Sequence, residues 1–267
     1  MKPIDMKRTS ALLLASSLGL AVQTQAQTVI DPLNGTVSIP YSTYLILDNS
    51  DGAGQGVSFG ESSSGLSASY VGTGTSAEQA LYLAPATSFS STFSVGDTLM
   101  VDSPLAASST AEDLGLAISA SNPSVASAAN SWNARPTFDY LSISVRPSGT
   151  SPGGTLRVNT SSGGSVVTSS FNLDPTLPID ALYIDWVSGT TFSFGYIDGS
   201  GNNVPDGSFT FGGASTIGTD IGFYGDLRAT GTSLGDFSNL TIVPEPSTMA
   251  LCGTGLSALL FLIRRKK

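Results

Sequence analysis

Residues 181–197 read ALYIDWVSGTTFSFGYI, and this stretch decides the class of fold. In its second half, Phe192, Phe194 and Tyr196 alternate with small or polar residues, which is the period of two of a half-buried strand. The segment 187–191, VSGTT, separates this run from an equally apolar one with residues typical of turns. The stretch therefore predicts a β-hairpin.

Short alternating runs of this kind recur along the chain, separated by Gly, Ser, Asn, Asp and Pro. They include 44–48, 88–95, 113–119, 138–145, 208–211 and 237–243. Only 75–84 has any helical character, and its second half is better interpreted as a strand. With about a dozen short strands and no repeat of fixed period, the sequence predicts an all-β antiparallel sandwich or jelly roll.

The first 26 residues have the pattern of a secretory signal peptide. A positively charged start is followed by the apolar stretch 11–22 and by small residues that favour cleavage between Ala26 and Gln27. The apolar stretch is shorter than the roughly 20 residues that a membrane-spanning helix needs. Signal peptidase is the expected partner of this segment, and a single β-sandwich domain, 27–243, is expected to be exported.

The last 24 residues, 244–267, contain three consecutive parts. These are the triplet Pro244, Glu245 and Pro246, a predicted transmembrane helix at 248–263, and the basic cluster Arg264, Arg265, Lys266 and Lys267. At ~1.5 Å per residue the apolar run 249–263 reaches about 22 Å, which is short for a hydrocarbon core of roughly 30 Å. Four cations directly after the run favour a cytoplasmic tail and an exported body.

Together these three parts resemble the PEP-CTERM sorting signal of exported Gram-negative proteins. The resemblance implies transient insertion into the inner membrane, recognition by an exosortase, and removal of the tail near the triplet on the way to the cell surface or extracellular matrix. A permanently membrane-anchored surface protein is the alternative. The segments 220–227 and 235–246 are also similar to the closing strands of concanavalin-like (laminin-G-type) jelly rolls, many of which bind carbohydrate.

The charge of the exported body excludes two classes of partner. Between residues 27 and 246 there are four arginines, no lysine and nineteen acidic residues, which gives a net charge near −15. Proteins that bind nucleic acid or anionic lipid neutralise phosphates with Lys and Arg. We therefore expect no nucleic acid partner.

The exported body lacks most of the side chains that serve as catalytic bases. The chain has no histidine, and its one cysteine, Cys252, lies in the predicted C-terminal helix, so the body has no His-dependent triad, no His or Cys zinc site and no disulfide. Asp180 and Asp185 are expected to point to opposite faces of one strand. We expect no enzyme and no catalytic residue, with a divergent polysaccharide-degrading enzyme that uses aspartates as the alternative.

Two segments rich in Asp, Asn and Gly are candidate calcium sites, although no cofactor is expected. Asn203 stands where a calcium loop requires Gly, and Phe209 where it requires a bidentate Glu. Such residues also form tight turns, which is the favoured interpretation. The candidate ligands are Asp198, Ser200, Asn202, Asp48 and Asp51.

The two tryptophans have different expected roles. Trp186 shares a strand face with Leu182 and Ile184 and is expected to pack in the core. Trp132 lies in an expected loop and is the candidate platform for stacking a sugar, with packing back onto the core as the alternative. The sequence thus predicts a structural or carbohydrate-binding module, with extracellular polysaccharide as the candidate ligand.

Overall fold

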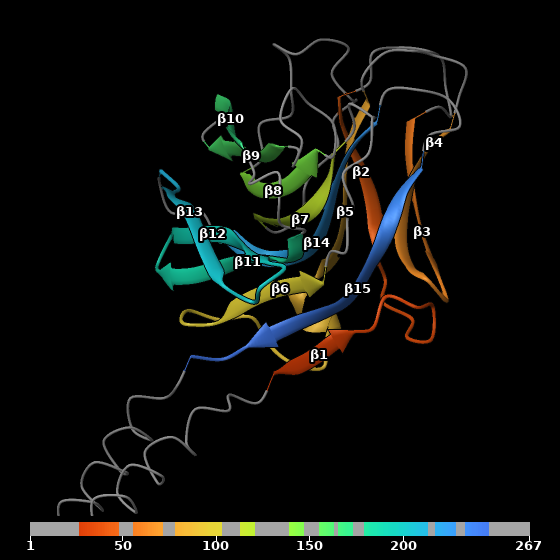
Figure 1. Cartoon of the computed structure of the whole chain (residues 1–267), viewed down its shortest axis with the longest axis horizontal. Helices are drawn as coiled ribbons and strands as arrows, with labels where there is room; N and C mark the ends of the chain where they lie inside the picture. Colours follow the sequence, from red (N-terminus) through yellow and green to blue (C-terminus); the bar gives the residue numbers. More distant parts are fainter. Residues whose placement is uncertain are drawn as a thin grey trace, which may run out of the picture. The chain divides into compact units, whose positions relative to one another are not determined.

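The computed structural model describes residues 27–47, 56–71, 78–102, 113–120, 139–146, 155–162, 165–172, 179–212, 217–227 and 233–245. Fifteen strands and one short 3-10 helix, η1 (Ala86–Ser88), lie in these ranges, and Thr28–Ile242 form one compact unit (Figure 1). The predicted all-β antiparallel sandwich is confirmed. None of the helices in these ranges is long and apolar enough to cross a membrane; the predicted signal peptide and the helix at 248–263 lie outside them.

One layer is an eight-stranded sheet in which the last strand that the structure describes lies in the middle. β15 lies between β6 and β4, and β1 also pairs with it. The order is β13 (Asn203–Thr210), β12 (Thr191–Asp198), β11 (Ile179–Ser188), β6 (Thr98–Asp102), β15 (Ser233–Val243), β4 (Gly65–Val71) and β3 (Gly56–Ser62), with β1 (Thr28–Asp31) off this path.

The other layer is a seven-stranded sheet joined throughout by antiparallel pairing. Its order is β10 (Ser165–Asn172), β9 (Thr155–Ser162), β8 (Tyr140–Arg146), β7 (Asp113–Ala120), β14 (Ile217–Leu227), β5 (Glu78–Pro85) and β2 (Ser42–Leu47). The second half of 75–84 forms part of β5, as predicted.

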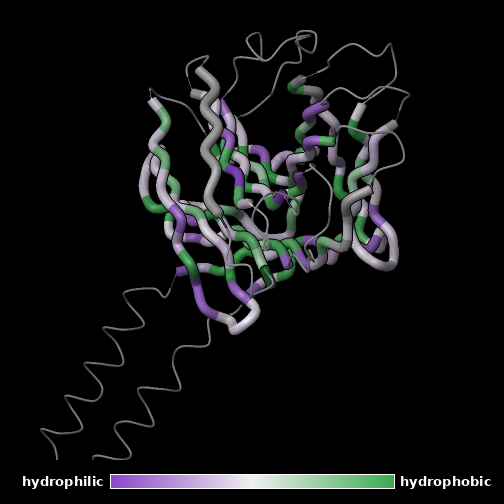
Figure 2. The backbone as a smooth tube through the Cα atoms, turned by 45° about the horizontal axis from the view of Figure 1, so that its top comes forward, coloured by the Kyte–Doolittle hydropathy of each residue, from purple (hydrophilic) through white to green (hydrophobic). Residues whose placement is uncertain are grey.

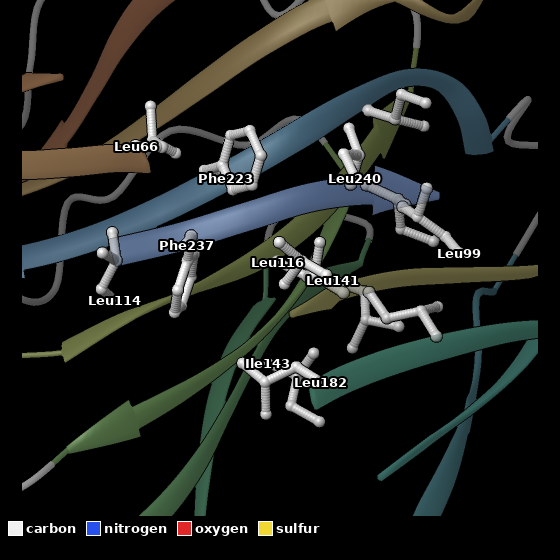
Figure 3. Close-up of a cluster of buried hydrophobic side chains, with 14 of the residues drawn as sticks. Leu66, Leu99, Leu114, Leu116, Leu141, Ile143, Leu182, Phe223, Phe237 and Leu240 are labelled. Carbon is white, nitrogen blue, oxygen red and sulfur yellow. The ribbon is translucent and has the colours of Figure 1, made fainter. Parts of the chain in front are cut away.

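Apolar side chains from the two facing layers form the core (Figure 3). Along β7, Leu114, Leu116 and Ile118 are fully buried in it, and Leu141 and Ile143 of β8 lie beside them. Polar and apolar residues alternate along many strands (Figure 2), because successive side chains point to opposite faces. Alternate residues of the seven-stranded sheet therefore project onto its outer face.

The predicted hairpin at 181–197 is present as β11 and β12, with Trp186 paired to Phe192. Phe192 and Phe194 are buried, and Trp186 packs at the margin of the core with its ring centroid 5.3 Å from that of Phe192. The Trp186 indole donates a hydrogen bond to the Gly189 carbonyl in the turn, at 2.8 Å. The predicted core role of Trp186 is confirmed.

The run 88–95 does not form the strand that its alternation indicates. Phe89 and Phe93 are buried, but they enter the core from an irregular segment that follows η1. The Ser94 amide donates to the Asp97 carboxylate at 2.8 Å, and the Asp97 amide donates to the Ser94 carbonyl at 2.9 Å. Local hydrogen bonds of a turn thus compete with sheet pairing in this segment.

Candidate functional site

The outer face of the seven-stranded sheet carries five polar side chains on five adjacent strands. They lie on β9, β8, β7, β14 and β5, at positions that alternate with core residues. We call them the charged cluster: Arg157, Arg146, Asp113, Asp226 and Gln79.

Strand register brings the two aspartates of the charged cluster together. Asp226 on β14 pairs with Asp113 on β7 and, on its other side, with Gln79 on β5. Residues directly opposite one another on antiparallel strands have neighbouring side chains. Two carboxylates so placed repel each other, and nearby cations offset that repulsion.

Arg146 supplies one of these cations. Its Nε donates to Asp113 Oδ1 at 2.5 Å, and its Nη2 donates to Asp113 Oδ2 at 3.3 Å. The same Nη2 lies 3.5 Å from Asp226 Oδ2. A two-pronged contact of this kind fixes the plane of the guanidinium as well as its position.

Arg157 supplies the second cation and bridges the two acids. Its Nη1 donates to Asp113 Oδ2 at 2.8 Å and lies 3.6 Å from Asp226 Oδ2. Gln79 Nε2 donates to the same oxygen of Asp226 at 3.0 Å. The charged cluster therefore holds two negative and two positive groups, and it uses two of the four arginines in the exported body.

Burial differs between the acids and the bases of this cluster. The side chains of Asp113 and Asp226 are 0% exposed, whereas those of Arg146 and Arg157 are 18% and 11% exposed. Burial, reinforced by the neighbouring Asp226, raises the pKa of Asp113 to about 6, although both arginines act in the opposite direction. The guanidinium groups thus form the accessible part of the site.

Aromatic and aliphatic side chains adjoin the charged cluster on the same face. Tyr224, two residues before Asp226 on β14, packs with Tyr140, Leu81, Leu83 and other buried residues. Within the ranges that the structure describes, the Tyr224 hydroxyl and Gln79 Oε1 are buried and have no hydrogen-bond partner. Buried polar atoms are normally paired, so two unpaired ones beside the charged cluster are unusual for a sheet face with a purely structural role.

The predicted calcium ligands at 198–202 form a turn. Asp198 Oδ1 accepts hydrogen bonds from the amides of Ser200 and Asn202, each at 2.9 Å, and Oδ2 accepts one from Asn202 Nδ2 at 3.1 Å. These bonds, with the Asn202 amide first, lower the pKa of Asp198. Asp48 and Asp51 lie outside the described residues, and the described ones contain no group of three His, Cys, Asp or Glu arranged to hold a metal.

Asp180 and Asp185, the other candidate acids, are not part of the charged cluster. Trp132 lies outside the described residues. Asp180 is exposed, and Asp185 on the same strand accepts hydrogen bonds from Thr98 Oγ1 at 2.6 Å and Ser193 Oγ at 2.9 Å. Thr98, Asp185 and Ser193 all belong to the eight-stranded sheet.

No local pattern in the sequence indicates the charged cluster, because its members are distant along the chain. Gln79 and Asp226, for example, are 147 residues apart. One signal was available: a body with four arginines places Arg146 directly after the predicted strand 138–145. When a body has few cationic residues, one that lies at the end of a strand is a candidate for an ion pair with a neighbouring strand.

The sorting triplet follows the folded body directly. β15 ends at Val243, and Pro244 and Glu245 are exposed and outside any strand. Gln27, the residue after the predicted signal cleavage site, is also exposed and precedes β1. Ala26, Pro246 and the basic cluster 264–267 lie outside the described residues. A protease can therefore reach the start of the triplet without opening the sheet.

Three solved structures illustrate what the body is similar to. It shares 12% identity with the carbohydrate-binding module CBM66 from Bacillus subtilis (72% of this chain and 92% of that one, TM-score 0.34). It shares 10% with a GlcNAcα1-4Gal-releasing endo-β-galactosidase from Clostridium perfringens (84% and 64%, TM-score 0.47), and 15% with the "Dario rerio" galectin-1-L2 (55% and 89%, TM-score 0.30). These values are too low to assign a ligand or an activity.

No curated protein matches the chain. Residues 243–266 match a family model, the PEP-CTERM protein-sorting motif, in agreement with the resemblance of the C-terminal segment. The body that precedes this motif is an all-β antiparallel sandwich. The chain therefore carries a PEP-CTERM sorting motif, which implies an exported protein sorted by an exosortase.

Proposed function

We propose that this protein is an exosortase-processed component of the cell surface or extracellular matrix whose body binds extracellular polysaccharide at the charged cluster. The observation that carries the proposal is the convergence of Asp113, Asp226, Arg146, Arg157 and Gln79 on one sheet face. These five residues lie on the outer face of the sheet, opposite the hydrophobic core, so packing of the core does not require them.

The chemistry of the charged cluster suits a sugar. Neighbouring hydroxyl groups of a sugar donate and accept hydrogen bonds, and planar carboxylate, guanidinium and amide groups present donors and acceptors in pairs. Arg146 and Arg157 are held rigidly by the acids behind them and retain exposed area. A preorganised donor loses little conformational entropy when a ligand binds.

Charge indicates an uncharged polysaccharide. The acids and bases of the charged cluster balance, while the body as a whole is near −15. An acidic polymer is repelled by such a body at low ionic strength, whereas a neutral polymer is not. We therefore expect a neutral glycan as the ligand.

The second candidate function is polysaccharide hydrolysis, and one observation favours it. Asp113, with a pKa raised to about 6, lies beside a second buried carboxylate, Asp226. Pairs of carboxyl groups with different environments perform acid and base roles in glycoside hydrolases. Binding remains the first proposal because both acids are engaged by arginines.

A glycan array with the body, residues 27–246, tests binding with and without calcium. An assay for new reducing ends on each bound glycan tests hydrolysis. We expect the body to bind a neutral polysaccharide and Arg146→Lys to weaken binding about tenfold, because lysine keeps the charge but loses the planar pair of donors. Asp180→Asn, at an exposed position outside the charged cluster, is the matched control and is expected to bind normally. Circular dichroism checks folding.

Each outcome of the array is decisive. Failure of the body to bind any glycan contradicts the proposal, as does unchanged binding by Arg146→Lys. Release of new reducing ends from a bound glycan supports the hydrolase instead. Loss of that release in Asp113→Asn then identifies the acid.

A further inference from the structure

The sandwich has two ends that differ in what they carry, and β15 runs between them (Figure 1). We call the end where β15 finishes the sorting end, because Pro244 follows it. Thr28 of β1 pairs with Ile242 there. Thr98 at the start of β6 is at the same level, since Thr241 Oγ1 donates to the Met100 carbonyl at 3.3 Å.

The charged cluster lies toward the other end, where β15 begins at Ser233. Ser233 pairs with Ser69, which in turn pairs with Ser58. Gly225, adjacent to Asp226, lies against the neighbours of Ser58, because a Cβ on Gly225 would be 3.1 Å from both Val57 and Phe59. We call this the charged end.

The length of β15 separates the two ends. Ser233 and Val243 are the first and last of its 11 residues. At about 3.3 Å per residue, roughly 33 Å lies between them. A surface in contact with the sorting end is therefore far from Ser58 and from the charged cluster.

Three exposed apolar side chains lie at the level of the sorting end. Val95 and Val187 are 54% and 52% exposed, and their segments are joined by a hydrogen bond of 2.7 Å from the Gly96 amide to the Trp186 carbonyl. Val29 of β1, next to Thr28, is 47% exposed. Among the residues that the structure describes, these three valines and Val37 are the exposed ones with large apolar side chains.

We propose that the sorting end is a docking surface for the membrane that holds the precursor, so that the charged end faces away from that membrane. The sequence indicates that the membrane is the partner of this surface. After Val243, only residues 244–247 connect the body to the apolar run, and four residues reach at most about 14 Å. The three valines favour an interface with uncharged lipid headgroups and acyl chains. The proposal rests on the proposed function only where it treats the charged cluster as a binding surface.

Site-specific quenching tests the orientation in the chain without its signal peptide, residues 27–267. Replacement of Cys252 by alanine leaves no cysteine, so Val187→Cys or Ser58→Cys introduces a single position for a fluorescent label. Each labelled chain is inserted into phosphatidylcholine vesicles that contain a nickel-chelating lipid as quencher. The chain has no histidine, so it has no imidazole that would bind the nickel directly.

We expect strong quenching at position 187 and little at position 58, because only the first lies at the sorting end. In the released body, residues 27–246, both labels are expected to stay bright with the same vesicles. Equal quenching of the two labels in the anchored chain, or stronger quenching at position 58, overturns the orientation. Thermal unfolding confirms that both labelled chains are folded.

A second variant tests the docking surface itself. With the label at position 187, replacement of Val29 and Val95 by serine is expected to reduce quenching about twofold, because less apolar area favours the interface. Unchanged quenching shows that the tether alone sets the orientation and overturns the docking surface. Glycan binding is measured separately, so its absence leaves these results intact and contradicts only the proposed function.

Discussion

Asp113 and Asp198 are two carboxylates in one sandwich that are stabilised in opposite ways. Asp198 is held by amides two and four residues later in its own turn. Asp113 is held by arginines 33 and 44 residues away, on the neighbouring strand and on the one beyond it. The first arrangement is local and readable as a motif, whereas the second exists only after the sheet has formed.

The environments of these two acids shift their pKa values in opposite directions. Hydrogen bonds, the first from Asn202, lower the pKa of Asp198. Burial and the neighbouring Asp226 raise the pKa of Asp113 to about 6. Desolvation penalises the charged form of a carboxyl group, and donated hydrogen bonds favour it. The comparison predicts that changes at the charged cluster have larger effects on stability than changes in the turn.

The largest expected effect comes from Arg157→Met. Methionine keeps much of the apolar stem but removes the cation that contacts both acids, so two buried carboxylates share one arginine. Breaking a buried ion pair in this way costs about 3–5 kcal/mol. Urea unfolding at pH 7 measures the loss.

Arg157→Lys is the matched control, and it is expected to recover part of the lost stability. It restores the charge without the planar fork. If Arg157→Met unfolds at the same urea concentration as the wild-type body, the charged cluster makes no net contribution and the comparison fails.

The second effect is the pH dependence due to Asp113. Its pKa is about 3.9 in an unfolded chain and about 6 in the folded body, so the folded state binds the proton more tightly. Its stabilising contribution is present in full below about pH 4 and is lost as the pH rises through about 6, by about 1–3 kcal/mol.

The difference between the wild-type body and Asp113→Asn isolates this contribution, because asparagine resembles the protonated acid and does not titrate. Between pH 4.5 and 7, we expect the wild type to lose more unfolding free energy than the variant. Parallel curves for the two proteins would contradict the raised pKa of Asp113.

The smallest effect is expected from Asp198→Ala in the turn. Because the folded pKa of Asp198 is lowered, its contribution is present above its unfolded pKa and disappears as the pH falls through the folded value. Asp198→Asn keeps an oxygen for the two backbone amides and should lie between alanine and wild type. Thermal unfolding ranks the three proteins.

Calcium separates the two interpretations of this turn. Since the Asp198 oxygens accept hydrogen bonds from Ser200 and Asn202, we expect millimolar calcium to leave the melting temperature unchanged. A calcium-dependent rise that is absent in Asp198→Ala would establish the alternative, a cation site.

The sequence by itself determined the features that depend on neighbouring residues. Alternation over 181–197 predicted the β11–β12 hairpin, and the order of triplet, apolar run and basic cluster indicated the sorting motif at 243–266. The turn at Asp198 also followed from its composition. These features are encoded within a few residues, so a pattern can reveal them.

Only the tertiary structure decided the features that depend on which strands are adjacent. It placed the last described strand, β15, in the middle of a sheet, and it gathered Gln79, Asp113 and Asp226 on one face from distant parts of the chain. Period-two alternation fixes the face on which a side chain projects but not the strand beside it. Pairing of β14 with β7 and β5 brought Asp226 to Asp113 and Gln79, which lie more than 100 residues away along the chain.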